Sequence, residues 1–142
     1  MTRVGFYIVE NTDPDSPSRL ALRLADKAHR RGHRIFVNCE SEAQARELDV
    51  QLWTFRSTSF IPHALISERE DEQVCLAWGQ EPALHDDLLI NLQSHVPTFV
   101  GRFHRVAELV NQQPQRLEAL RVSWRHYRER GYALEEHRLP SV

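Results

Sequence analysis

The sequence predicts a single α/β domain, residues 1–142, in which helices flank a mostly parallel central sheet. A short apolar run rich in β-branched and aromatic residues, VGFYIV at 4–9, is typical of a strand buried on both faces. Helical periodicity follows, and then another such run at 34–38, an order that favours parallel pairing. The first strand-to-helix turn contains no glycine. We therefore expect a Rossmann-like fold that lacks the glycine-rich phosphate loop.

The first helix is expected at residues 18–31. Ser16 and Pro17 suit the N-cap and the first helical position. Apolar residues then recur at three- and four-residue spacing, which predicts one buried side. Gly32 can end the helix in the left-handed conformation.

The remaining elements follow from capping signals and apolar runs. Ser41 and Gln44 stand at capping-box spacing and predict a second helix that extends to about residue 53. Two further strands are expected at 74–78 (VCLAW) and 88–92 (LLINL). A fifth strand is expected at 106–110, although VAEL is equally compatible with a helix. The last helix is expected at 114–130, ending at Gly131.

Composition limits the classes of function. The chain has 142 residues, 27% of them charged, with a formal net charge of −2, whereas a protein that binds mainly bare nucleic acid usually has a strongly basic face. Two cysteines without a CxxC pair fit a reducing cytosol. No apolar run approaches the roughly 20 residues of a membrane span, and the first residues lack the features of a signal peptide. We expect a cytoplasmic protein without membrane association.

The residues give no sign of catalytic chemistry. The first strand-to-helix turn, ENTDPDSPSR, carries Glu10, Asp13 and Asp15, whose carboxylates would repel a phosphate. Cys39 at the end of the second strand is interpreted as a small buried side chain, because no histidine partner is apparent. We predict no metal site, no cofactor and no enzymatic activity in this chain.

Two segments have the composition of protein-binding surfaces. Residues 52–65 concentrate aromatic side chains in a stretch that is too irregular for a helix, and Pro62 argues against a central strand. These rings form either an exposed anchor for a partner or a cover over the edge of the core. In the last helix, Arg121, Arg125 and Arg128 form a basic stripe beside Trp124, which suits an acidic peptide with an apolar end. The alternative is a solvated helix face.

These segments resemble the chi subunit family of bacterial DNA polymerase III holoenzyme. The similar stretches follow one another along nearly the whole chain. They are FYIVEN, RGHRIFVNCES, ELDVQLWTFRSTSFIPHAL, VCLAW, LLINL, FHRVAELV and WRHYRERGY. The most specific part is LD-x-x-LW…SF-x-PH, which comprises Leu48, Asp49, Leu52, Trp53, Ser59, Phe60, Pro62 and His63.

The resemblance implies a non-catalytic accessory subunit that bridges two proteins during DNA replication. One is the psi subunit of the clamp loader, and the implied binding residues are Trp53, Phe60, Ile61 and Pro62. The other is the acidic C-terminal tail of single-stranded DNA-binding protein. The implied tail-binding residues are Val110, Arg121, Trp124, Arg125 and Arg128. DNA would be contacted only indirectly or weakly.

The sequence departs from the family pattern at the implied tail site. Trp124 stands where a tyrosine is expected and Arg125 where a lysine is expected, so the aromatic and cationic characters are kept. Leu117, next to Arg116, occupies a position where a basic residue is expected. Two alternatives to bridging remain open: a small nucleotide-dependent enzyme, and a direct single-strand binder that uses the arginine stripe with its aromatic neighbours.

Overall fold

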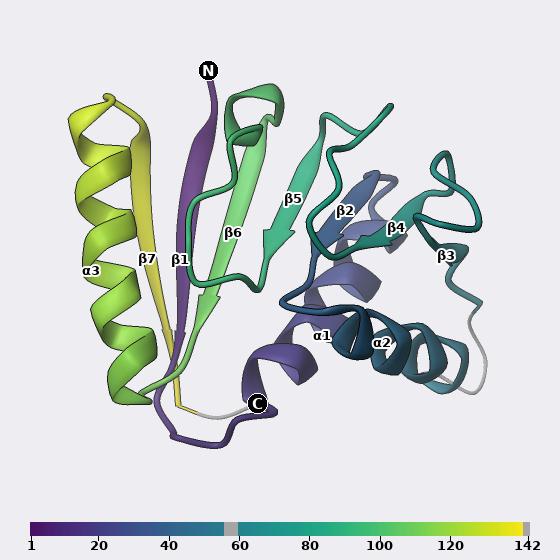
Figure 1. Cartoon of the computed structure of the whole chain (residues 1–142), viewed down its shortest axis with the longest axis horizontal. Coiled ribbons are helices and arrows are strands. Elements are labelled where there is room, and N and C mark those ends of the chain that lie inside the picture. Colours follow the sequence, from purple (N-terminus) through teal and green to yellow (C-terminus); the bar gives the residue numbers. More distant parts are fainter. Residues whose placement is uncertain (56–59, 141–142) are drawn as a thin grey trace.

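The computed structural model describes residues 1–55 and 60–140 and shows a seven-stranded sheet (Figure 1). The strands are β1 (Arg3–Val9), β2 (Ile35–Asn38), β3 (His63–Leu65), β4 (Val74–Ala77), β5 (Leu88–Asn91), β6 (Arg105–Val110) and β7 (Ala133–Leu139). The other elements are the helices α1 (Ser16–Arg30), α2 (Glu42–Thr54) and α3 (Pro114–Glu129) and a single 3₁₀ turn, η1 (Val100–Arg102).

The strand order across the sheet is β3-β4-β2-β5-β6-β1-β7, and every neighbouring pair is parallel. The predicted α/β fold with a parallel sheet is thus confirmed. β1 and β2 follow one another along the chain with α1 between them, yet β5 and β6 lie between them in the sheet. β1 is paired on both sides, with β6 and β7, which accounts for its nearly continuous apolar sequence.

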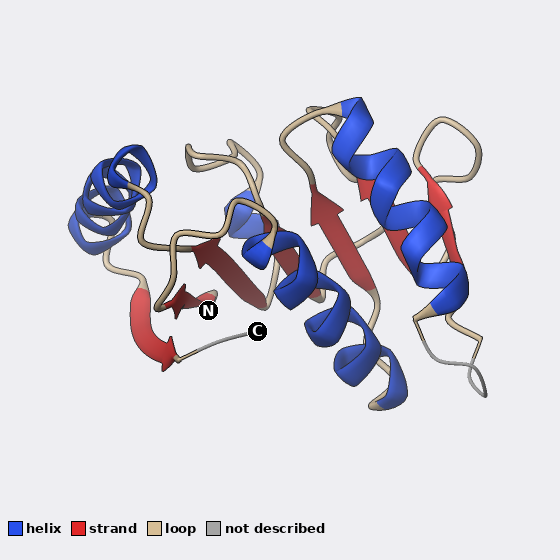
Figure 2. Cartoon of the chain, turned by 90° about the horizontal axis from the view of Figure 1, so that it is seen from below, coloured by secondary structure: helices blue, strands red, loops and turns tan. Residues whose placement is uncertain are grey.

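Both faces of the sheet are covered. Alternate residues of β2 show this, because Ile35 and Val37 pack with α1 and α2, whereas Phe36 packs with the cluster that includes Tyr127 of α3. α1 and α3 therefore lie on opposite sides of the sheet (Figure 2). The segment around η1 also packs on the α3 side, through Phe99 and Phe103.

The ends of α1 agree with the prediction at one terminus and differ at the other. Gly32 has a φ of 85° and follows the last turn, where the amides of Gly32 and His33 donate to the carbonyls of His29 and Ala28. At the start, Ser16 is the first helical residue and not the N-cap. Its hydroxyl donates to the carbonyl of Asp13 at 2.8 Å, because the preceding turn already brings that carbonyl into reach.

The start of α2 follows the predicted capping pattern. The Ser41 hydroxyl accepts a hydrogen bond from the amide of Gln44 at 3.1 Å. The Gln44 side chain reaches back to accept from the amide of Glu40 at 2.7 Å and donates to the hydroxyl of Ser18 in α1 at 3.1 Å. The cap thus also ties α2 to α1.

For three strands the structure either differs from the prediction or decides between two predicted alternatives. Residues 105–110 form β6, so the strand alternative for VAEL is confirmed. The segment expected to be irregular contains β3, a three-residue edge strand that starts just after Pro62. A strand can begin there because the missing N–H of proline falls before the ladder. β7, which forms the other edge of the sheet, was not predicted.

Candidate protein-interaction surfaces

The turn after β1 holds its own carboxylate where nucleotide-binding folds place a phosphate. The Asp13 carboxylate accepts a hydrogen bond from the amide of Asp15 at 2.9 Å and pairs with Arg19 at 2.6 Å. The hydrogen bond from Asp15, with help from Arg19, lowers the pKa of Asp13. A negative charge therefore sits at the start of α1, where a bound phosphate would need to approach.

The candidate nucleophile Cys39 is fully buried after β2. Burial raises the pKa of its thiol to about 12, so the thiol is not the ionised nucleophile that cysteine catalysis requires. His29 and His33 stand four residues apart in the sequence, a spacing that also occurs between metal ligands. No group of three or more metal-ligating side chains occurs within residues 1–55 and 60–140.

An aromatic patch, made of Trp53 and Phe60 with Pro62 beside them, lies at the β3 edge of the sheet. Trp53 is 57% exposed and Phe60 60% exposed, and their ring centroids are 5.2 Å apart. Val50, one turn before Trp53 in α2, is also an exposed apolar side chain. Of the two interpretations of this segment, exposed anchor or core cover, the structure supports the first for Trp53 and Phe60.

His63 forms the base of the aromatic patch. Its side chain is fully buried and its ring centroid lies 4.7 Å from that of Trp53 in an edge-to-face arrangement. Nδ1 lies 2.6 Å from the carbonyl of Ile61, and Nε2 lies 3.0 Å from the carbonyl of Asp49 in α2. The imidazole thereby fixes the segment before β3 against α2, which holds the exposed rings in place.

Ile61 does not belong to the exposed part of this patch. Its side chain is 1% exposed and packs in the core cluster beneath α1 and α2. The Ile61 side chain therefore points inward in this structure, and its expected contact with a partner stays a prediction. Ser59, part of the specific sequence motif, and residues 56–58 lie outside the described residues.

The second surface is carried by α3. Ser123 and Tyr127 are its buried residues, and Trp124 is half-buried with its ring centroid 5.0 Å from that of Phe6 in β1. Trp124 thus has one side against the core and one side toward solvent. Arg121, at 69% side-chain exposure, lies near it on the helix surface.

The exposed arginines of α3 form a basic face, defined as Arg121, Arg125 and Arg128. Within the described part of the chain, Arg121 has a 3.7 Å contact with Glu118, and neither of the other two is in an ion pair. Arg116 is not part of this face, because its side chain is 12% exposed, pairs with Glu40 and donates to the carbonyl of Leu92 at 2.9 Å. It fastens α3 to the ends of β2 and β5.

A buried polar row crosses the sheet beneath α3. Asn38, Asn91 and Glu108 are register partners on β2, β5 and β6. Asn38 donates to Asn91 at 3.0 Å, and Asn91 donates to the Glu108 carboxylate at 2.9 Å. The Tyr127 hydroxyl donates to the other Glu108 oxygen at 2.6 Å. This row was not predicted, although one predicted strand ends in Asn38, another contains Asn91 and VAEL contains a glutamate.

Burial changes the ionisation of the row. It raises the pKa of Glu108 to about 7, against the opposing effect of the hydrogen bonds from Tyr127 and Asn91. Burial also raises the pKa of Tyr127, and the neighbouring Glu108 adds to this. The hydroxyl of Tyr127 therefore stays protonated and remains the donor that joins α3 to β6.

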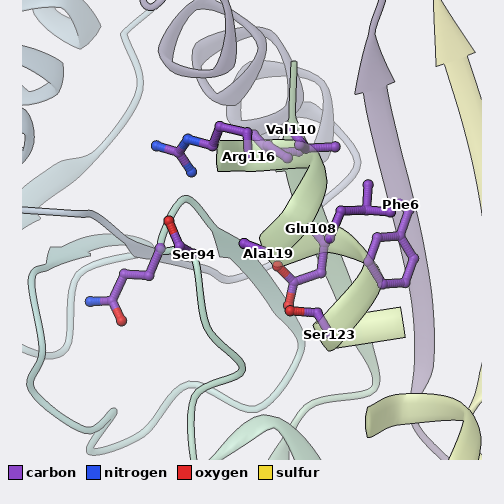
Figure 3. A pocket seen from close by; sticks show the side chains of 10 residues that line it. Phe6, Ser94, Glu108, Val110, Arg116, Ala119 and Ser123 are labelled. Carbon is purple, nitrogen blue, oxygen red and sulfur yellow. The ribbon is translucent and has the colours of Figure 1, made fainter. Parts of the chain in front are cut away.

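A hollow of about 20 Å³ lies between β6 and α3, next to the carboxylate of Glu108 (Figure 3). Val110 lines it and is only 5% exposed, so it is not a surface residue. Figure 3 shows the Arg116 guanidinium directed away from the Phe6 ring. The hollow has room for about one water molecule. Direct contact between Val110 and a bound peptide would require the hollow to open, and the expected role of Val110 as a contact residue stays a prediction.

The two surfaces lie at opposite ends of the sheet. α2 contacts β3, which is one edge strand, and α3 contacts β6 and β7, the latter being the other edge strand. Figure 1 shows the full width of the sheet between α3 and the end of α2. The aromatic patch and the basic face of α3 therefore share no helix or strand.

Comparison with known proteins agrees with the resemblance of the separate sequence segments to the chi subunit family. Residues 1–135 match the family described as DNA polymerase III chi subunit, HolC. The chain belongs to this family. Because the family consists of subunits of DNA polymerase III, membership associates the chain with DNA replication.

Curated relatives cover nearly the whole length. The DNA polymerase III subunit chi of Pseudomonas aeruginosa is 48% identical over 142 residues, which is all of both chains. The subunit chi of Escherichia coli is 32% identical over 141 residues, with 94% of this chain and 96% of the relative covered. That of Haemophilus influenzae is 31% identical over 132 residues, with 91% and 92% covered. No helix in the described part of this chi-family chain is long and apolar enough to cross a membrane.

Proposed function

We propose that this chi-family chain is a non-catalytic bridge between the psi subunit of the clamp loader and the acidic tail of single-stranded DNA-binding protein. The observation that carries the proposal is the placement of two different surfaces, one aromatic and one basic, at opposite edges of one sheet. The thiol of Cys39 is buried, and the carboxylate of Asp13 occupies the turn where a phosphate would bind. Both features agree with a role in binding rather than in catalysis.

The basic face of α3 supports an acidic peptide as its ligand. Arg121, Arg125 and Arg128 offer guanidinium groups that form paired hydrogen bonds with carboxylates. The solvent-facing side of Trp124 gives an apolar end of the peptide a ring to pack on, while Phe6 holds the opposite side. The contact set that we propose is therefore Arg121, Trp124, Arg125 and Arg128, with Val110 supporting them from beneath.

The aromatic patch supports a protein partner with an apolar anchor. Trp53 and Phe60 pack against one another in a tilted arrangement above a buried histidine, so little side-chain freedom is lost when a partner covers them. Aromatic residues in such positions supply most of the energy of many interfaces. We assign psi binding to Trp53, Phe60 and Pro62.

Bridging gives modest contacts a large effect. When one end is held, the second contact becomes intramolecular, and its effective concentration rises without any new interaction. The chain would in this way keep the clamp loader close to single-stranded DNA covered by its binding protein. A cytoplasmic location goes with that role.

The first prediction concerns the tail site. Arg125→Glu places a negative charge within the basic face and should weaken binding of a tail peptide by on the order of 1–3 kcal/mol, or roughly 5- to 150-fold. The measurement is a titration of the purified chain with a fluorescent tail peptide. Binding by the natural chain should also weaken as salt increases, because the arginines are exposed and screened.

Arg23→Glu is the matched control, because Arg23 is an exposed arginine of α1, on the other side of the sheet. It makes the same change in net charge and should leave tail binding nearly unchanged. Equal losses in both variants would show that only net charge matters. Unchanged affinity in Arg125→Glu would remove the tail site from α3.

A further inference from the structure

A basic segment that serves neither proposed surface surrounds the end of α1. Residues 23–34 contain five lysines and arginines, two histidines and a single acid, Asp26. Asp26 is buried and its carboxylate lies 3.1 Å from Arg30, so it neutralises a charge within the segment. The remaining cations include Lys27 and Arg31, which are exposed and one helical turn apart.

Lys27 and Arg31 border a cavity of about 190 Å³ between α1 and the sheet. Arg105, the first residue of β6, lines it from the sheet side. The three side chains thus approach one space from two elements. Within the described residues none of the three is in an ion pair.

The acid that lines this cavity does not cancel its charge. The Asp87 carboxylate lies 2.9 Å from Nδ1 of His33 and accepts a hydrogen bond from the amide of Arg34 at 3.2 Å. It is therefore already engaged by the turn between α1 and β2. The cavity keeps an excess of positive charge and suits an anionic ligand.

The floor of the cavity is apolar and aromatic. Leu24 and Leu88 line it together with the half-buried ring of Tyr7. Tyr7 is stacked on His137 of β7, with ring centroids 4.6 Å apart and ring planes 19° apart. Guanidinium and ammonium groups around a flat aromatic floor match a ligand that alternates phosphates with flat bases.

The position in the fold favours a polynucleotide over a free nucleotide. The cavity lies at the amino ends of β5 and β6, whereas doubly wound sheets bind mononucleotides beyond the carboxyl ends, at a helix N-terminus. No helix N-terminus contributes here, so phosphate contact depends on separate side-chain cations. Such cations beside an aromatic ring follow the backbone of a single strand.

We propose that the cavity formed by Lys27, Arg31, Arg105 and Tyr7 is a weak binding site for single-stranded nucleic acid. The site is separate from the basic face of α3 and lies on the other side of the sheet. It does not depend on either proposed protein contact. Through this site the chain would contact the single-stranded DNA that is covered by single-stranded DNA-binding protein.

The test is fluorescence anisotropy of a labelled oligothymidylate of about 16 nucleotides with the full chain. Three phosphate contacts predict a slope of about −2 for log affinity against log salt. Lys27→Gln/Arg31→Gln should lower the affinity at least tenfold at about 50 mM salt and reduce the slope to about −0.7. Both residues are exposed, so the variant should fold, which circular dichroism checks.

Arg121→Gln/Arg125→Gln is the matched control and should bind the oligonucleotide like the natural chain. Loss of binding in this control, with full binding in the cavity variant, would overturn the proposal and assign the contact to α3. Absence of any binding by the natural chain would overturn it as well. Equal binding of duplex DNA or of an acidic peptide at the cavity would also overturn it, since neither ligand presents exposed bases to Tyr7.

Discussion

Glu108 has a carboxyl group buried within the sheet. It is 6% exposed, has no cationic partner among residues 1–55 and 60–140, and accepts hydrogen bonds from Tyr127 and Asn91. Its pKa is raised from 4.5 to about 7, so the folded protein keeps this proton where the unfolded chain has already lost it. Stability should therefore fall as pH rises from about 4.5 to 7, and level off above that range.

Glu108→Gln should remove this pH dependence, because an amide cannot ionise and still offers an oxygen to one donor. The shift corresponds to roughly 3 kcal/mol, so most of a difference of that size between about pH 5 and pH 8 should disappear. Urea unfolding at the two pH values measures it. Glu118→Gln, which changes an exposed acid of α3, is the control and should follow the natural chain. The same pH dependence in both variants would contradict the assignment to Glu108.

Individual burial was the least predictable property of the candidate residues. Trp53, Phe60, Arg121 and Arg125 are at the surface as expected, whereas Ile61 is buried. In a short irregular segment no periodicity distinguishes the inward side chain from its outward neighbours. Val110 is buried for a different reason: α3 returns over the end of β6, and that crossing depends on long-range packing that the local sequence does not contain.

At the scale of elements, the aromatic patch is formed jointly by α2 and the segment that leads into β3. Phe60→Ala should weaken psi binding by at least about 2 kcal/mol, because it removes an exposed ring that packs against Trp53. Stability should change by less than about 1 kcal/mol, since the ring is mostly outside the core. A pull-down of psi, followed by calorimetric titration, measures the effect.

Val122→Ala is the control for this variant, because Val122 is also an exposed apolar residue, 59% accessible, but lies on α3. It should retain psi, and both variants should retain the tail peptide. If Phe60→Ala bound psi as tightly as the natural chain, the aromatic patch would not be the psi site.

Elements buried on both faces were predictable, and edge elements were not. β1, β2, β4 and β5 are short apolar runs, and their bounds differ by only a residue or two from the expected ranges. β7 has the sequence ALEEHRL and pairs with β1 at the edge of the described sheet, so its side chains are exposed or half-buried and its composition resembles a loop. β3 is three residues long and follows a proline, which gives too short a pattern to detect.

The whole molecule separates its surfaces by means of its strand order. β1 lies near one edge and not beside β2, which moves α3 and β7 to one end and leaves α2 and β3 at the other. The expected Rossmann-like class was confirmed, but the class alone does not specify this order. The distance between the two proposed binding surfaces is thus a consequence of pairing that the local sequence patterns did not specify.

Two sites at opposite edges should bind independently. The affinity for the tail peptide should change by less than about twofold when psi is saturating, because groups this far apart with no shared contacts contribute additively. By linkage, the tail should affect psi binding equally little.

Titrating labelled tail peptide into the chain, with and without psi, measures the coupling, and sedimentation velocity detects the complex of all three. Arg125→Glu should lose the tail from that complex and keep psi, whereas Phe60→Ala should do the reverse. Release of the tail by psi would mean that the two surfaces overlap or are coupled, and the chain would then exchange partners instead of joining them.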